Sequence, residues 1–180
     1  SNVVMPTSLD TINNEQSVGV APAGWTFAIW GVIYSLLAVF AIYQCLPGSW
    51  VKSRSDDFIF NQIGWLWSIN MILNAIWLPT FMSNSTVGFI FAQIIIIPML
   101  ATALVMGKRA VNNHLTVPEM IGFRLGVSIY SGWLSTATIL GAAIMLKTWG
   151  WSSVNGDDEV IPTVVMLWIA FVIYCANTFL

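Results

Sequence analysis

The stretch PAGWTFAIWGVIY, residues 22–34, decides the fold because it opens a long apolar run with aromatic residues at helical spacing. Trp30 and Tyr34 are four residues apart, and Phe27 precedes Trp30 by three residues. On a helix these three side chains therefore share one face. Such a face is suited to a flat apolar ligand, so the stretch predicts an apolar helix with a ligand-facing side.

The composition excludes a water-soluble globule. Of the 180 residues, 57% are hydrophobic and 8% are charged, and the mean hydropathy is +0.79, whereas soluble proteins are about a quarter charged. Five near-continuous apolar stretches are each long enough to cross a hydrocarbon core about 30 Å thick. We therefore predict an all-α fold, a polytopic membrane helix bundle. The expected transmembrane helices are residues 24–46, 58–82, 87–106, 118–146 and 161–180, in a single domain over residues 24–180 that follows a polar segment, residues 1–23.

The residue pattern gives little support for catalysis, metal binding or nucleic-acid binding. The net charge is only -2 and there is no basic block, so no nucleic-acid partner is expected. Cys45 and Cys175 lie in apolar runs without metal-ligand spacing. His114, in a basic loop, is interpreted as a solvated residue rather than a haem ligand. We predict no catalytic residues, no metal and no required cofactor.

The second expected helix carries amides within apolar sequence. Trp67, Asn70, Asn74 and Trp77 fall at i, i+3, i+7 and i+10, which places them on one stripe. Amides in lipid need partners, so the stripe should face other helices or a cavity. Hydrogen bonding across helices and ligand contact both remain open for the two asparagines.

The fourth expected helix, residues 118–146, carries two small-xxx-small motifs. Close backbone approach supports helix association in lipid, where no hydrophobic force drives helices together. The predicted packing residues are Gly122, Gly126, Ser128 and Gly132.

Three motifs in this order resemble the TspO/MBR family of tryptophan-rich sensory and translocator proteins, once called peripheral benzodiazepine receptors. Residues 22–34 resemble the family's PPGWVFGPVWxxxY motif, with one residue fewer between the tryptophans. Residues 73–77, LNAIW, are similar to its LNxxW motif, and residues 130–133, YSGW, with Ala137 are similar to its PYxxW motif. The family's first helix would precede residue 1, so the resemblance implies a sixth helix and a divergent, eukaryote-type branch.

The resemblance also implies a ligand-binding cavity between helices. The family's ligands are porphyrins, including haem, and sterols, and its members are commonly dimers. The residues that the resemblance and the helical stripes assign to ligand binding are Trp25, Phe27, Trp30, Tyr34, Asn70, Asn74, Trp77, Tyr130, Trp133 and Ala137. The chain departs from the family at three positions, with Ile129 for a proline, Asn70 for a glutamine and Gly141 for an asparagine.

Two functions of different classes follow from these patterns. The first is a binding protein with a transporter or sensor role for a tetrapyrrole or sterol-like ligand. The second is a structural accessory subunit of a larger membrane complex, in which ligand binding has been lost. Porphyrin breakdown is a weakly supported third function, so we expect no enzyme. The expected partners are membrane lipids, a hydrophobic small molecule and a second copy or a larger complex, in a mitochondrial or other organellar membrane rather than the plasma membrane.

The distribution of basic residues predicts the orientation in the membrane. The loops after the first and third expected helices hold Lys52, Arg54, Lys108 and Arg109, whereas the opposite side has Lys147. By the positive-inside tendency the basic side is cytoplasmic or matrix-like, and residues 1–23 lie opposite. In a cysteine-free background, single cysteines at positions 52 and 108 should react with an impermeant reagent from one side, and one at position 10 from the other. Equal labelling of positions 10 and 52 from one side would contradict this topology.

Overall fold

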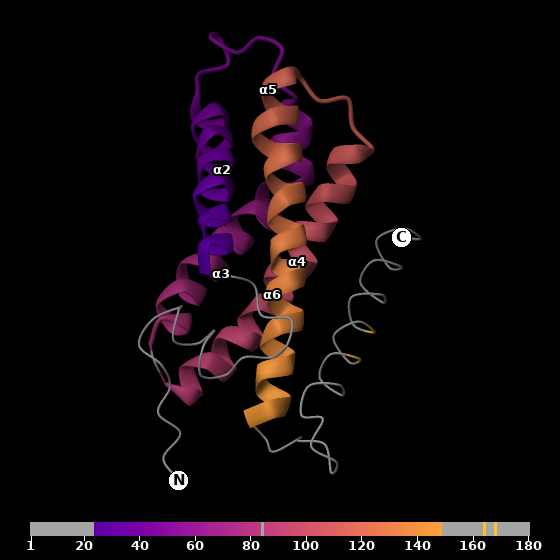
Figure 1. Ribbon diagram of the computed structural model, residues 1–180. Helices are drawn as coiled ribbons and strands as arrows, with labels where there is room; N and C mark the ends of the chain where they lie inside the picture. Colours follow the sequence, from indigo (N-terminus) through magenta and orange to yellow (C-terminus); the bar gives the residue numbers. More distant parts are fainter. Residues whose placement is uncertain (1–23, 84, 149–163, 165–167, 169–180) are drawn as a thin grey trace. The chain divides into compact units, whose positions relative to one another are not determined.

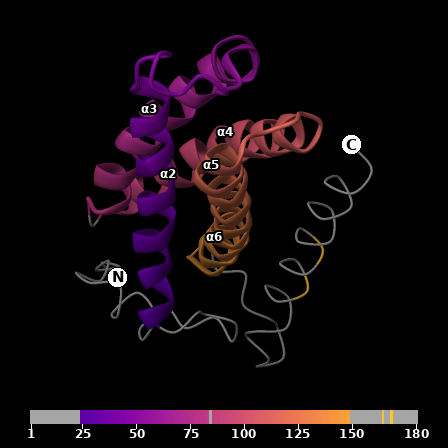
Figure 2. The same cartoon turned by 90° about the horizontal axis from the view of Figure 1, so that it is seen from above.

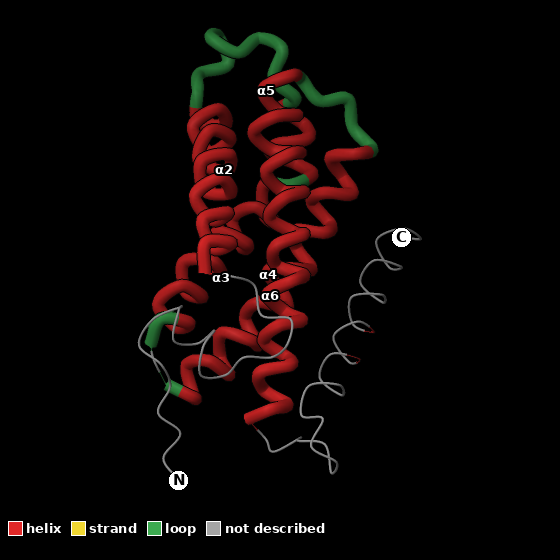
Figure 3. Tube along the Cα trace, viewed as in Figure 1, coloured by secondary structure: helices red, strands yellow, loops and turns green. Residues whose placement is uncertain are grey.

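The computed structural model describes residues 24–83, 85–148, 164 and 168, and these residues form helices joined by short loops, without a strand (Figures 1 and 3). The all-α prediction is therefore confirmed. Residues 1–23 and, apart from Val164 and Trp168, the helix expected over 161–180 lie outside the described residues.

The chain divides into two compact units. The first, which we call the core unit, comprises residues 28–75 and 98–134. The second, which we call the hairpin unit, contains the described parts of residues 1–27, 76–97 and 135–180. The expectation of one membrane domain over residues 24–180 stays a prediction.

The first expected helix begins with a tight turn. A 3-10 helix, η1 (Gly24–Ala28), leads into α2 (Ile29–Cys45), and such turns are common at helix N-termini. The helix ends at Cys45, and the backbone of the next residue, Leu46, is extended. Arg54 Nη1 donates hydrogen bonds to the carbonyl oxygens of Gln44 (3.2 Å) and Leu46 (2.6 Å). The arginine therefore provides the hydrogen-bond donor at the C-terminal end of the helix, where a glycine cap would otherwise do so.

The next two helices contain internal prolines. A π-helical turn, η2 (Asp57–Gln62), precedes α3 (Gly64–Phe81), which includes Pro79, and α4 (Thr86–Val111) includes Pro98. At the start of α4, the Ser85 hydroxyl accepts a hydrogen bond from the Gly88 N–H (3.0 Å), as expected of an N-cap serine.

The third helix is longer than the sequence predicts. We expect it to end at Met106, before Gly107, but α4 continues to Val111. Ala110 is buried, and a Cβ built on Gly107 would lie 3.9 Å from Val127 Cγ1, so packing against another helix extends this segment. Basic residues in its last turn also suit the negative end of the helix dipole.

The fourth expected helix consists of three pieces. A short turn, α5 (Val117–Glu119), is followed by a π-helical segment, η3 (Met120–Leu125), and then by α6 (Gly126–Thr148). Glu119 Oε2 accepts a hydrogen bond (2.8 Å) from the backbone N–H of Thr116, three residues earlier. This bond provides a partner for a backbone N–H at the start of the helix, where no helical carbonyl is available.

Aromatic rings fill the centre of the core unit. The ring of Phe40 lies 4.6 Å from that of Phe123 and 4.9 Å from that of Trp67, between ring centroids, and Phe58 lies 5.4 Å from Phe123. These four side chains are buried. They come from α2, η2, α3 and η3, so the cluster joins the first, second and fourth expected helices.

The start of the fourth helical segment lies beside α2 (Figures 1 and 2), and two glycines allow the two segments to approach closely. A Cβ on Gly122 would lie 3.4 Å from the backbone nitrogen of Phe40, and a Cβ on Gly126 would lie 3.1 Å from Leu36 Cβ. The other two predicted packing residues differ. The Ser128 hydroxyl donates to the Arg124 carbonyl (2.7 Å), and a Cβ on Gly132 would have no atom within 4 Å.

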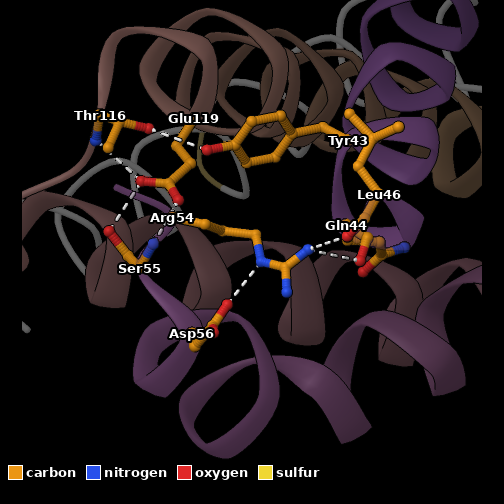
Figure 4. A network of polar contacts seen from close by, with 8 residues as sticks. All are labelled: Tyr43, Gln44, Leu46, Arg54, Ser55, Asp56, Thr116 and Glu119. Carbon is orange, nitrogen blue, oxygen red and sulfur yellow. Dashed lines mark hydrogen bonds and ion pairs between the residues drawn. The ribbon is translucent and has the colours of Figure 1, made fainter. Parts of the chain in front are cut away.

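A buried carboxylate joins two loops at one end of the core unit (Figure 4). Glu119, which is fully buried, accepts hydrogen bonds from the N–H and the hydroxyl of Ser55, each at 2.8 Å, besides the bond from Thr116. Ser55 follows α2 and Thr116 follows α4. The loop that carries Lys52 and the last turn of α4, which carries Lys108, therefore lie at the same end of this unit. The orientation of this end in the membrane stays a prediction.

Two of the described helices are long and apolar enough to cross a membrane, Trp25–Cys45 and Thr86–Val111. The predicted spans 58–82 and 118–146 do not meet this criterion. The first is interrupted at Ile63, between η2 and α3, and carries polar amides, and the second is rich in glycine, serine and threonine. Polar side chains that are hydrogen-bonded within the chain lower the hydropathy of a segment without exposing a polar group to lipid.

The close approach at Gly126 gives a direct test. Gly126→Leu should force α2 and α6 apart in the core unit and lower the free energy of unfolding by about 1–3 kcal/mol, the usual cost of overpacking. Unfolding in detergent, followed by circular dichroism, measures this change. Gly132→Leu is the matched control and should be close to wild type, because a Cβ there meets open space. Equal stability of both variants would show that the glycine contact is not required.

Candidate functional site

Aromatic side chains from α2 and α6 converge in the core unit. The rings of Trp30 and Tyr34 are stacked, with centroids 5.2 Å apart and an interplanar angle of 22°. Trp30 also meets Tyr130 and Trp133 edge to face, each at 6.3 Å between centroids. Aromatic pairs favour these offset and edge-on arrangements. Trp30 is thus the ring that connects the two helices.

An amide connects this group to α3. Asn74 Oδ1 accepts a hydrogen bond from the Tyr34 hydroxyl (3.1 Å), and Asn74 Nδ2 donates one to the Tyr130 hydroxyl (3.0 Å). A tyrosine hydroxyl that accepts a hydrogen bond still has its own hydrogen to donate. The chain of hydrogen bonds therefore ends on a group that can bind a further oxygen. We call Trp30, Tyr34, Asn74, Tyr130 and Trp133 the aromatic–amide cluster.

The cluster has an accessible side and a buried side. Tyr34 is 37% exposed and Trp30 is half-buried, whereas Asn74, Tyr130 and Trp133 are buried. An apolar molecule that approaches from the membrane would therefore meet Trp30 and Tyr34 first. The amide and the inner hydroxyl lie behind these two rings.

Asn70 does not join the cluster. Its side chain is fully buried, and Nδ2 donates to the Met99 carbonyl (2.8 Å) and to Thr102 Oγ1 (2.7 Å). Both partners belong to α4. Of the two alternatives left open by the sequence, Asn70 makes hydrogen bonds across helices, one helical turn away from the amide that contacts the tyrosines.

The remaining candidates for ligand binding belong to the hairpin unit. Trp25 is 81% exposed, and Phe27 and Ala137 are half-buried. Trp77 is buried and stacks on Phe81, with centroids 5.0 Å apart and an interplanar angle of 14°. Five of the ten predicted residues thus form one cluster, Asn70 lies apart from it, and four lie in the other unit.

Gln93 is a polar residue of the hairpin unit that the sequence motifs leave without a role. Its amide lies against Gly141, because a Cβ on that glycine would be 2.0 Å from Gln93 Oε1. A single amide between Thr86 and Thr102, in otherwise apolar sequence, is the signal that could have identified it.

The long apolar helices and the hydrogen bonds that Asn70 and Asn74 make between helices are features of a helical membrane protein. The family model described as TSPO-like protein matches residues 2–180, so the chain belongs to this family. The resemblance stated from the three motifs is thereby confirmed, as is a TspO-like helical membrane bundle. No curated protein and no solved structure matches the chain.

Proposed function

We propose that this protein binds a tetrapyrrole or sterol-like ligand at the aromatic–amide cluster and acts as a transporter or sensor. The observation that supports this proposal is the convergence of Trp30, Asn74 and Trp133, which come from three helices and from three separate motifs. A mitochondrial or other organellar membrane is the proposed location.

The chemistry of the cluster fits such a ligand. A flat apolar molecule gains about 25 cal/mol for each Å² of apolar surface buried, and contact with an aromatic ring adds roughly 0.5–1.5 kcal/mol. A few polar groups then set the orientation of the ligand. Asn74 and the Tyr130 hydroxyl supply these groups, behind the exposed edge formed by Trp30 and Tyr34.

The proposed role is binding without chemical change of the ligand. The cluster consists of two indoles, two phenols and one amide. None of these groups is a ready proton acceptor or nucleophile near neutral pH. No cofactor is required for binding in this proposal.

A structural accessory subunit is the second candidate. One face of α2 carries the small residues Gly31, Ser35 and Ala38, all exposed, and a Cβ on Gly31 would have no atom within 4 Å. In lipid, such a face permits close approach of another helix. A second copy of the chain or a subunit of a larger complex is the proposed partner.

Porphyrin titration followed by tryptophan quenching tests the first proposal. Trp133→Ala should weaken porphyrin binding by an order of magnitude or more, because the ligand loses both apolar contact and a ring interaction. The matched control is Trp65→Ala, in the same unit, since Trp65 is 81% exposed and lies outside the cluster. It should bind as wild type does. If the wild-type protein shows no saturable binding, the structural-subunit proposal replaces the ligand-binding one.

A further inference from the structure

The charged side chains of the core unit carry an excess of positive charge. This unit has five basic and three acidic residues, a net charge of +2, whereas the rest of the chain has one basic and five acidic residues. The basic residues of the unit are Lys52, Arg54, Lys108, Arg109 and Arg124. In a chain with so few charges, this asymmetry favours a negatively charged partner at the core unit.

All three carboxylates of the core unit already have partners within the protein. Glu119 is buried and accepts hydrogen bonds from two loops. Asp56 Oδ1 pairs with Arg54 Nε at 2.5 Å. The carboxylate of Asp57 accepts hydrogen bonds from two side-chain amides of η2, at 2.8 and 2.9 Å. These carboxylates therefore leave most of the basic residues without an acidic partner.

Three of the five basic residues are available to an external anion. Arg54 caps α2, with only 8% of its side chain exposed, and Arg109 donates a hydrogen bond to a backbone carbonyl of η2. Lys52, Lys108 and Arg124 are exposed, and among the described residues their side chains form no ion pair or hydrogen bond. We call these three residues the basic group.

The basic group lies around one end of the core unit. The loop after α2 carries Lys52, and the last turn of α4 carries Lys108. Glu119 joins this loop to the segment that follows α4 (Figure 4). Arg124 follows Glu119 by five residues, and helical side chains tilt toward the N-terminus of their helix. Its guanidinium can therefore reach back toward the same end, as long basic side chains do near a membrane surface.

This end of the core unit has the features of a segment at the level of the lipid headgroups. The two helices that are long and apolar enough to cross a membrane, Trp25–Cys45 and Thr86–Val111, both end here. Trp50, in the same loop as Lys52, is 77% exposed. Tryptophan is enriched at the boundary between hydrocarbon and water, where its ring is apolar and its N–H is hydrated. The basic group is thus placed where lipid phosphates lie.

We infer that the basic group binds the phosphate groups of anionic phospholipids in the leaflet at this end of the protein. The phosphate supplies the negative charge that the core unit lacks, and each lysine near an anionic surface strengthens binding roughly fivefold. Ile42 and Val105, toward the same ends of α2 and α4, are exposed and apolar, so they can contact the acyl chains. This combination favours a lipid over a soluble anion.

Competition between two lipids with the same acyl chains tests the site. Purified protein in a neutral detergent is titrated with dansyl-labelled phosphatidylglycerol, and energy transfer from tryptophan reports binding. Unlabelled phosphatidylglycerol should displace the probe better than phosphatidylcholine by about tenfold or more. Lys52→Gln/Lys108→Gln should lose most of this preference, at roughly fivefold per lysine. Lys52→Arg/Lys108→Arg is the matched control, and it should keep the preference because it keeps both charges.

Two further measurements use the wild-type protein alone. Added salt should weaken the binding of phosphatidylglycerol but not of phosphatidylcholine, because ions screen exposed charges. Inorganic phosphate should not displace the labelled lipid, and displacement by it would overturn the assignment to a lipid. Equal competition by the two lipids, a preference that does not depend on salt, or a preference that survives in the glutamine variant would each overturn the proposed site.

Discussion

The structure depends on the requirement that polar side chains in a membrane find partners within the protein. Asn74 shows this most clearly, since its carbonyl and amide groups bind two tyrosines from two other helices. Without Asn74, the hydroxyls of Tyr34 and Tyr130 would each lose this hydrogen bond. Asn70 meets this requirement only through Nδ2, which donates to the backbone and to a side chain of α4. Its Oδ1 is buried without a hydrogen-bond partner among the described residues. Hydrogen bonds of the amides thus fix which helices are neighbours in the core unit.

Close packing at the start of the fourth helical segment places the aromatic residues within reach of one another. Gly122 and Gly126 bring η3 and α6 against α2, so Tyr130 and Trp133, one and two turns further along, meet Trp30. At the end of this unit, Glu119 joins the loops that follow α2 and α4. The ligand-binding proposal therefore rests on rings that are positioned by backbone contacts rather than by flexible loops.

The sequence predicted the helices and the local aromatic spacing, because both follow from periodicity along one segment. Trp30 and Tyr34 are stacked as their four-residue separation predicts. Pairs across helices could not be predicted in this way, since the partner of Asn70 is about thirty residues distant and Gln93 meets Gly141 through the tertiary fold. Gly107 has the appearance of a helix end, but packing continues α4 beyond it.

Nuclear magnetic resonance of the indole N–H groups tests the central claim, that the aromatic–amide cluster binds a flat ligand. A porphyrin placed against Trp30 and Trp133 should shift their indole resonances strongly through its ring current, while the exposed Trp65 should not move. The shifts should saturate as porphyrin is added. Saturable shifts confined to other tryptophans, with Trp30 and Trp133 unchanged, would contradict the account.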